Sequence, residues 1–337
     1  MDMEQGAYII YGSEYSPFSV KVRAYFRFKQ IAHEWRPRTK ENMSHFMEYA
    51  KLPLVPLVIG ADGSTLQDST PIMEKMEKKF PENSLYPPSQ EAAFVSMMLE
   101  EYADEWVNKP MFHYRWWRDV DQIHVANALA GNMNPIATKA EKETQAAQIR
   151  KRMVSRLGFV GSSKQNKEII ENSLDQLLDL LETHLSNRSY LFGGRPAFAD
   201  FGLFGQLYGC TQQPTSLKIM ERYPNVMKWV QHMLHPHIEG DWEGWGDVSD
   251  TLIPVLKTQV SELYLPWATA NTAALVKGLT EFTVTLNGSD FTQDSVKYVG
   301  RSFQALKTRF ASIENRAPLE EILLKAGCMT PLIAENW

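Results

Sequence analysis

The order in which short apolar runs give way to long helical patterns most constrains how this chain can fold. Up to about residue 80, apolar runs such as "AYIIYG" and "LVPLVIG" alternate with helical patterns such as "SPFSVKVRAYFRFKQI" and "DSTPIMEKMEKKF". The stretch "VPLVIGADGSTLQDS" is typical of a hairpin that turns at "ADGS". Alternating strands and helices predict a small α/β domain, which we place at residues 1–85.

The pattern changes after residue 80. "PENSLYPPSQ" is dense in proline and turn-forming residues and is typical of a linker. The periodic runs that follow, such as "EAAFVSMMLEEYADEWVNKPMFHYRWW" and "KEIIENSLDQLLDLLETHL", predict long helices without intervening strands. We therefore expect an all-helical domain at residues 92–240.

Residues 241–337 form a third part with a mixed pattern. "TVTLNGSDFT" predicts a hairpin with an Asn-Gly turn, and "YLPWATANTAALVKGL" and "VKYVGRSFQALKTRF" predict amphipathic helices on either side of it. The apolar faces of these helices need a partner. We expect an α+β extension that packs on the helical domain, where it could cover the body, shape a cleft or support a dimer.

Composition excludes several classes of function. The net charge of -5 leaves no basic surplus to neutralise phosphates, so we expect no nucleic-acid partner. No apolar stretch is long enough to span a bilayer, and the start "MDMEQG" lacks a signal pattern. Two cysteines, Cys210 and Cys328, fit a reducing compartment. These features favour a cytoplasmic protein without membrane contact.

The junction "YGSEYSPFS" joins the first strand directly to a helix. Ser16 before Pro17 is the favoured arrangement of an N-cap and the first helical position, which is sufficient to explain Ser16 structurally. A helix N-terminus also presents unpaired amides to an anion. A hydroxyl that accepts from the Ser19 amide still has its proton to donate, so a structural and a chemical role are compatible.

Three motifs, "YGSEYSPFS", Val55-Pro56 and "LQDSTPI", occur in an order that resembles the glutathione transferase family over residues 7–235. The first is similar to the serine-type start of the phi and theta classes, whereas omega-like relatives carry cysteine there. The resemblance implies a thioredoxin-like domain followed by an all-α domain. It also implies that Ser16 hydrogen-bonds the glutathione sulfur, with Tyr15 as a second catalytic candidate and Tyr11 as a strand residue.

The resemblance also implies how glutathione, the co-substrate, is held. Val55 would pair its backbone with the cysteinyl part through a cis bond to Pro56. The Asp68 carboxylate would hold the γ-glutamyl ammonium, and Ser69 at a helix start would hold the γ-glutamyl carboxylate. A hydroxyl donor near the helix N-terminus would favour the thiolate, which attacks an electrophile.

Two positions depart from the family pattern. In "RPAFADFGLF" Ala197 replaces the hydroxyl of a capping box whose Asp200 remains, so one of its two reciprocal bonds is lost. The family often places a lysine just before the cis-proline segment, but "KLPLVP" has Lys51 further upstream. This second departure concerns the recognition of the glycyl end of glutathione.

The aromatic stretch "DEWVNKPMFHYRWW" is the candidate surface for the electrophile. We expect Phe18, Met111, Tyr114 and Trp117 to line the binding site of the electrophile. The alternative is that these aromatic side chains only pack the helical domain. His113 could serve as an acid or base, or as a structural hydrogen-bonding residue.

A histidine-rich stretch, "HMLHPHIEGD", carries His232, His235, His237, Glu239 and Asp241. Pro236 interrupts the helix there, and histidines near a helix C-terminus are explained by the helix dipole. We expect no metal site.

The resemblance favours a transferase that joins glutathione to a small apolar electrophile or reduces a hydroperoxide, as in detoxification. It also implies a homodimer. The alternative is a non-catalytic interaction or scaffold protein on the same fold.

Overall fold

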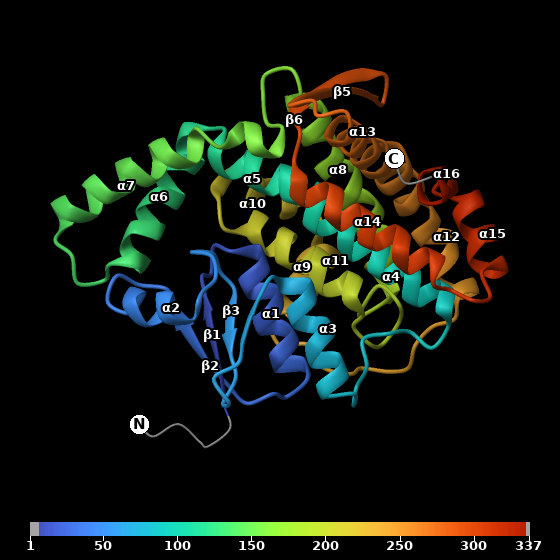
Figure 1. Ribbon diagram of the computed structural model, residues 1–337, viewed down its shortest axis with the longest axis horizontal. Helices are drawn as coiled ribbons and strands as arrows, with labels where there is room; N and C mark the ends of the chain where they lie inside the picture. The colour runs from blue at the N-terminus through green and yellow to red at the C-terminus, as the bar shows by residue number, and fades with distance from the viewer. Residues whose placement is uncertain (1–6, 335–337) are drawn as a thin grey trace.

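The computed structural model describes residues 7–334 of the 337-residue chain, so the opening "MDMEQG" that bears on a signal lies outside the described residues. Figure 1 shows a small sheet beside a much larger helical body. The first unit has the order β1 (Tyr8–Gly12), α1 (Pro17–Phe28), β2 (His33–Pro37), α2 (Met43–Tyr49), β3 (Leu57–Ile59), β4 (Thr65–Gln67) and α3 (Ser69–Lys79). This is the α/β arrangement that the sequence predicts.

The four strands form one sheet in the order β2-β1-β3-β4, in which β1 and β2 are parallel and the other pairs are antiparallel. Strand side chains alternate between faces. Ile10 therefore joins the core that includes α1 and α3, whereas Ile9 and Tyr11 pack with Phe46 of α2. Tyr11 lies in β1, as predicted, and its hydroxyl is 2.8 Å from Nδ1 of His45.

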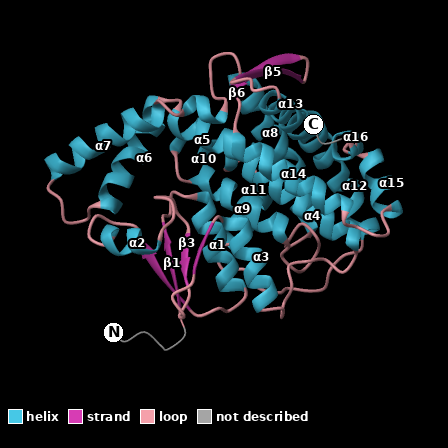
Figure 2. Ribbon diagram, viewed as in Figure 1, coloured by secondary structure: helices cyan, strands magenta, loops and turns pink. Residues whose placement is uncertain are grey.

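The second unit is helical, as Figure 2 shows. Its elements are α4 (Gln90–Tyr102), the π-helical segment η1 (Ala103–Val107), α5 (Asn108–Trp116), α6 (Asp119–Met133), α7 (Lys139–Val154), η2 (Leu157–Val160), α8 (Lys167–His184), η3 (Leu185–Asn187), α9 (Phe198–Thr211), α10 (Pro214–Met220) and α11 (Pro224–His232). Between β4 and β5 every regular element is a helix, so the expected all-α domain is confirmed.

The extension comprises α12 (Trp245–Val255), the π-helical segment η4 (Leu256–Tyr264), α13 (Leu265–Val276), the hairpin β5 (Glu281–Leu286) and β6 (Ser289–Asp294), α14 (Lys297–Ala311), α15 (Ala317–Lys325) and α16 (Met329–Ile333). Helix α12 packs on α8, α14 and α15 pack on α4, and β6 contacts η2. Its buried residues share one hydrophobic core with the helical unit. The extension is therefore part of the body rather than an appendage.

A buried cation fastens the first unit to the second. Lys21 of α1 is fully buried, and its Nζ lies 2.5 Å from Glu100 Oε1 and 2.6 Å from Asp104 Oδ2. Although burial disfavours the ammonium, Asp104 and Glu100 hold the pKa of Lys21 above its usual value. The start of α1 is thus fixed against α4 and η1.

Asp200 makes the half of the capping box that the sequence predicts. Its Oδ2 accepts from the Ala197 amide at 2.9 Å, and its Oδ1 accepts from the Leu191 amide at 3.0 Å. Ala197 has no side-chain oxygen to return a bond. Within residues 7–334, none of the helices is long and apolar enough to cross a membrane.

Candidate active site

The junction between β1 and α1 has the predicted geometry. Ser16 is the N-cap of α1 with extended backbone, Pro17 occupies the first turn, and Ser16 Oγ accepts from the Ser19 amide at 3.3 Å. The capping role of Ser16 is therefore confirmed. Its side chain is half-buried, and the hydroxyl proton is not used by the cap.

The Val55–Pro56 peptide bond is cis, as predicted. The loop that precedes it is tied to the end of β4 by one side chain. The Gln67 amide oxygen accepts from the Lys51 backbone N–H at 2.8 Å, and its NH₂ donates to the Leu54 carbonyl at 2.9 Å. Lys51, although shifted upstream in the sequence, reaches the same cavity as Val55 and Pro56.

Asp68 has a backbone conformation that non-glycine residues seldom adopt, with φ of 79°. It precedes α3, but its carboxylate makes no capping bond to that helix. Instead, Oδ2 accepts from the Tyr298 hydroxyl of α14 at 2.8 Å. Unusual backbone conformations concentrate at functional sites, and here the carboxylate is exposed on the cavity wall.

Ser69, the next residue, is turned inward. It is 1% exposed, and its Oγ accepts from Lys21 Nζ at 3.3 Å. The hydroxyl is thus engaged by the buried charge cluster of Lys21, Glu100 and Asp104. Ser69 nevertheless lines the same cavity as Asp68, at the N-terminus of α3.

These residues surround a cavity of about 540 Å³. Its first wall belongs to the small unit and includes Phe18, Val55, Pro56, Asp68 and Ser69. Its second wall comes from η1 and the start of α5, and its third from the extension, through Trp267, Gln293 and Tyr298. The cavity therefore lies between all three parts of the chain.

The predicted substrate-lining residues are divided by the structure. Phe18 lines the cavity. Met111 and Tyr114 are each 2% exposed within the main core, and Trp117 stacks on His113 with ring centroids 5.1 Å apart. The structure does not bring these three side chains to the described cavity wall. Helix α5 directs them into the helical packing instead.

Tyr15 faces the helical unit. Its ring packs with the cluster that contains Trp116 and Phe112, and Arg115 Nη1 donates to the Tyr15 carbonyl at 2.6 Å. Burial raises the pKa of the Tyr15 phenol. Neither Tyr15 nor Ser16 is among the residues that line the 540 Å³ cavity, which reaches α1 at Phe18.

His113 has the structural surroundings that the sequence left open. Its Nδ1 lies 2.7 Å from Ser162 Oγ, and its Nε2 lies 3.0 Å from Glu171 Oε1. Burial lowers the pKa of this imidazole. Because both ring nitrogens are engaged inside the helical unit, His113 anchors α5 to α8.

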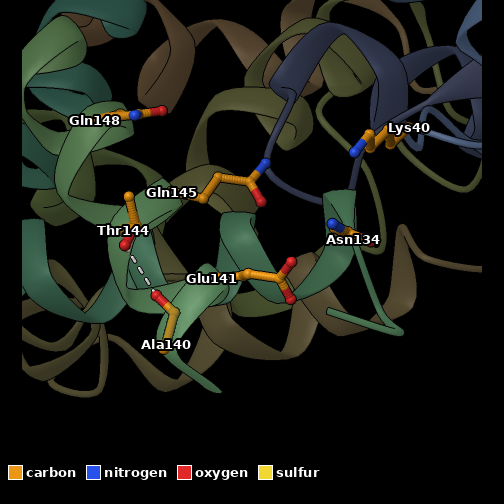
Figure 3. A pocket seen from close by; sticks show the side chains of 7 residues that line it. All are labelled: Lys40, Asn134, Ala140, Glu141, Thr144, Gln145 and Gln148. Atoms are coloured by element: carbon orange, nitrogen blue, oxygen red, sulfur yellow. Dashed lines mark hydrogen bonds between the residues drawn. The ribbon is translucent and has the colours of Figure 1, made fainter. Parts of the chain in front are cut away.

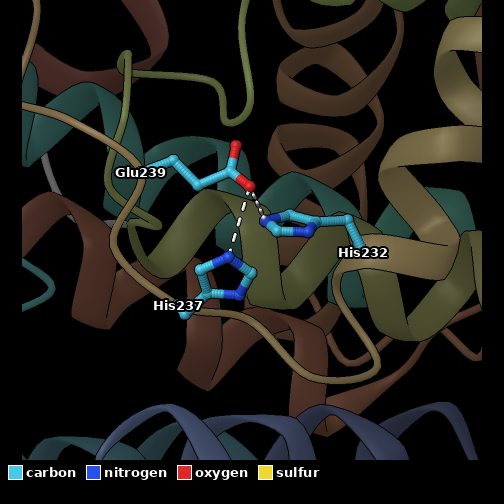
Figure 4. Close-up of side chains that lie close together, drawn as sticks. All are labelled: His232, His237 and Glu239. Atoms are coloured by element: carbon cyan, nitrogen blue, oxygen red, sulfur yellow. Dashed lines mark ion pairs between the residues drawn. The ribbon is translucent and has the colours of Figure 1, made fainter.

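Part of the histidine-rich stretch does converge (Figure 4). The Nε2 atoms of His232 and His237 lie 3.6 and 3.3 Å from Glu239 Oε1. One ligand atom from each of these residues falls within 4.8 Å of the others. However, His232 Nε2 is also 2.6 Å from the Tyr190 hydroxyl, which in turn donates to the His237 carbonyl at 2.5 Å. These contacts give the cluster a structural role, because they hold the C-terminal end of α11 against Tyr190.

A second concavity, of about 470 Å³, lies between the loop after β2 and the α6–α7 pair (Figure 3). It is lined by polar side chains whose bonds are local. Glu141 completes the capping box with Thr138, and Thr144 Oγ1 donates to the Ala140 carbonyl at 2.9 Å. The residues predicted to bind glutathione line the 540 Å³ cavity and not this cleft, so that cavity is the candidate active site.

Sequence reasoning missed Lys109, Trp267, Gln293 and Tyr298 on the cavity wall. A signal for Lys109 was present, because it lies three residues after Trp106 in a helical stretch that is rich in aromatic residues. The other three lie in the extension, and no local pattern indicates that they meet residues of the first unit.

Comparison with known proteins identifies both main units. The N-terminal domain model of the glutathione S-transferases matches residues 10–84, and the C-terminal domain model matches residues 147–232. No curated protein sequence matches the chain.

Solved structures with a similar fold include the glutathione transferase GSTFuA3 from Phanerochaete chrysosporium, at 16% identity and a TM-score of 0.48, covering 69% of this chain and 99% of that chain. A glutathione S-transferase from Methylobacillus flagellatus with glutathione bound has 18% identity and a TM-score of 0.40, covering 73% and 98%. The transferase URE2P6 from Phanerochaete chrysosporium, in complex with oxidized glutathione, has 14% identity and a TM-score of 0.35, covering 74% and 96%.

The first match coincides with the α/β unit, and the second covers the later part of the helical unit, from α7 to α11. The chain therefore carries the N-terminal and the C-terminal domain of the glutathione S-transferases.

Proposed function

We propose that this protein is a glutathione transferase that binds glutathione in the 540 Å³ cavity and activates its thiol for attack on an apolar electrophile. One observation carries the proposal. The cis Val55–Pro56 segment and the exposed Asp68 carboxylate, which come from different loops, lie on one wall of one cavity together with Phe18 of the first α1 turn. Glutathione offers a peptide backbone and an ammonium group to these two features.

In this proposal the Val55 backbone pairs with the cysteinyl part of glutathione, and Asp68 holds the γ-glutamyl ammonium. Ser69, at the start of α3, provides its amide for the γ-glutamyl carboxylate, because its hydroxyl is engaged by Lys21. Ser16 precedes Phe18 of the cavity wall by two residues, and in this proposal the sulfur extends beyond the wall to accept the Ser16 hydroxyl proton. The helix N-terminus and this donor together favour the thiolate.

The chemistry demands little else from the chain. A free thiol with a pKa near ~8.5 is mostly protonated at neutral pH, and stabilising the thiolate raises the concentration of the nucleophile. Both family models that match this chain are domains of glutathione S-transferases, which supports glutathione as the ligand here. Conjugation and hydroperoxide reduction both start from this thiolate.

We further propose a cytoplasmic homodimer. Cys210 and Cys328 are both free and buried, which suits a reducing compartment. The second candidate function, a non-catalytic interaction protein, is favoured by the size of the extension and by the Tyr298 hydroxyl that already occupies one oxygen of Asp68.

Calorimetric titration with glutathione tests the proposal. Asp68→Ala should weaken binding by about 1.5 to 3 kcal/mol, because a charge-assisted hydrogen bond to the ammonium is lost. The matched control is Asp250→Ala, which removes an exposed carboxylate on α12 and should bind like the parent. Equal affinities of the parent and the Asp68 variant would contradict the assigned orientation. A parent that binds no glutathione would favour the interaction protein.

A further inference from the structure

We propose that Lys109 is a catalytic residue at the electrophile end of the cavity, where its ammonium group gives a proton to an oxygen of the electrophile as the thiolate adds. The inference rests on the proposed transferase function and adds a role for one residue to it. It concerns those neutral, apolar electrophiles whose carbonyl oxygen gains negative charge when the thiolate adds to a conjugated carbon–carbon double bond.

The position of Lys109 is the first observation. It is the second residue of α5, directly after the π-helical segment η1, and it is only 2% exposed although it lines the cavity. Its Nζ donates to Gln293 Oε1 at 2.9 Å and to the Val160 carbonyl at 3.3 Å. The ammonium also lies 3.7 Å from the ring centroid of Trp267. All three of these partners line the same cavity.

The material of the surrounding wall is the second observation. Phe18, Phe159, Val160, Val296 and Val299 give this part of the cavity an apolar surface. A charged group costs free energy in such surroundings unless it has specific partners. Lys109 keeps two hydrogen bonds and an aromatic face, contributed largely by the extension, which hold its Nζ at the wall rather than letting it reach solvent.

The other ionisable groups on the wall define the charge that the site tolerates. Asp68, Asp104 and Glu105 face the cavity, as do Lys51 and Tyr298. Burial raises the pKa of Asp104 to about 7, and it raises the pKa of Glu105 well above its usual value. These raised pKa values mean that burial disfavours negative charge at this wall. An electrophile that is neutral when it binds and gains negative charge only in the reaction therefore suits the wall better than an anionic one.

Lys109 is suited to proton transfer near neutral pH. Burial lowers the pKa of its ammonium to about 7, against the opposing effect of Glu105. An acid whose pKa lies near the working pH is both present in its protonated form and able to release its proton. Lysines in exposed positions, by contrast, hold the proton too tightly to act as general acids at this pH.

The step is balanced by the groups already named. The glutathione sulfur forms a bond to the β-carbon of the unsaturated ketone, and the π pair between the α- and β-carbons becomes a π bond between the α-carbon and the carbonyl carbon. The π pair of the carbonyl moves to its oxygen. Lys109 gives that oxygen a proton, and the resulting enol rearranges to the ketone. Neutral Lys109 then takes back, through solvent, the proton that the thiol released. No oxidant or reductant is required.

The test compares two electrophiles on the full-length protein. The first is 4-phenylbut-3-en-2-one, an unsaturated ketone, and the second is 4-nitrobenzyl chloride, whose chloride leaves without a proton. Lys109→Met should lower kcat/KM for the ketone about 100-fold, the usual contribution of a general acid, and change that for the chloride by less than about twofold. Lys139→Met, at an exposed lysine on α7, is the matched control.

The pH profile gives a readout that a structural role would not change. For the parent, kcat/KM for the ketone should fall above the Lys109 pKa of about 7, because the ammonium is the donor and is lost as the pH rises. The chloride should show only the rise caused by thiolate formation. Lys109→Met and Lys109→Arg should both lose the falling limb, since guanidinium does not release its proton.

Four outcomes decide the matter. A ketone-specific loss in Lys109→Met together with the lost limb supports the inference. Equal losses on both electrophiles, or no loss on either, overturn it while the transferase proposal stands. Thermal unfolding of each variant checks that it is folded at the assay temperature. A parent that binds no glutathione and turns over neither electrophile overturns the proposed function and this inference together.

Discussion

The Ser16 hydroxyl has two tasks that a single substitution can separate. Because its oxygen caps α1 through the Ser19 amide, Ser16→Ala should lower the free energy of unfolding by about 0.5 to 2 kcal/mol. If the hydroxyl also donates to the sulfur, the same variant should raise the pKa of bound glutathione. Thiolate absorbance of the complex against pH measures this shift, and chemical denaturation measures the stability.

A variant with the stability loss alone, and with the thiol pKa and turnover of the parent, would reduce Ser16 to a cap. Tyr15 does not replace it easily, since its ring packs among helical residues and burial raises its pKa. Ser16→Cys offers a contrast, because a thiol at a helix N-terminus can form a mixed disulfide with glutathione.

At the scale of elements, α1 and α9 meet at a glycine. A Cβ on Gly205 would lie 2.7 Å from the Pro17 carbonyl oxygen and 3.3 Å from Lys21 Cβ, closer than the backbone permits. Gly205→Ala should therefore push the first turn of α1 away, lower the free energy of unfolding by about 1 to 3 kcal/mol and weaken glutathione binding. Urea unfolding and calorimetry measure these effects.

Gly131→Ala on α6 is the matched control, since a Cβ there meets nothing within 4 Å. In that open helical position alanine should stabilise the protein by roughly 0.5 to 1 kcal/mol. If the two variants had similar free energies of unfolding, the α1–α9 contact would be able to rearrange without loss of stability, and the prediction would be wrong.

Periodicity predicts most elements because it reflects burial, and β1, α1, α8, α9 and the β5–β6 hairpin lie where the sequence places them. Local motifs, rather than periodicity, indicated Ser16, Val55–Pro56 and Asp68 as candidate site residues. The periodic pattern does not show that α4 continues into a π-helical segment, because that depends on tertiary packing. Nor does it show that Tyr298 reaches Asp68 across 230 positions of the chain, because such pairing is decided by the folded body.

At the scale of the whole molecule, we expect a two-fold dimer in which the small unit of one chain meets the helical unit of the other. Met47 and Leu52 of the small unit are 47% and 58% exposed, and Ile123 of α6 is 50% exposed. Figure 1 shows α2 and the α6–α7 arm on the same side of the molecule. Burying these side chains between two copies would remove apolar surface from water.

Sedimentation at micromolar concentration should show the dimer, and Ile123→Asp should dissociate it. Val276→Asp, at a residue of the extension that is 55% exposed, should leave the dimer intact. A parent that sediments only as a monomer would count against the pairing, and dissociation by the Val276 variant would move the interface to the extension.

The three-part cavity also sets an order of events during synthesis on the ribosome. The wall assigned to glutathione emerges first, whereas Trp267, Gln293 and Tyr298 emerge only after both family domains have been made. Until then Lys109 lacks its aromatic cover and its amide partner, and the apolar side of α4 lacks α14. A nascent chain can thus form its proposed thiol-binding wall before its proposed electrophile-binding wall exists. During that interval the apolar side of α4 is exposed and can be bound by chaperones.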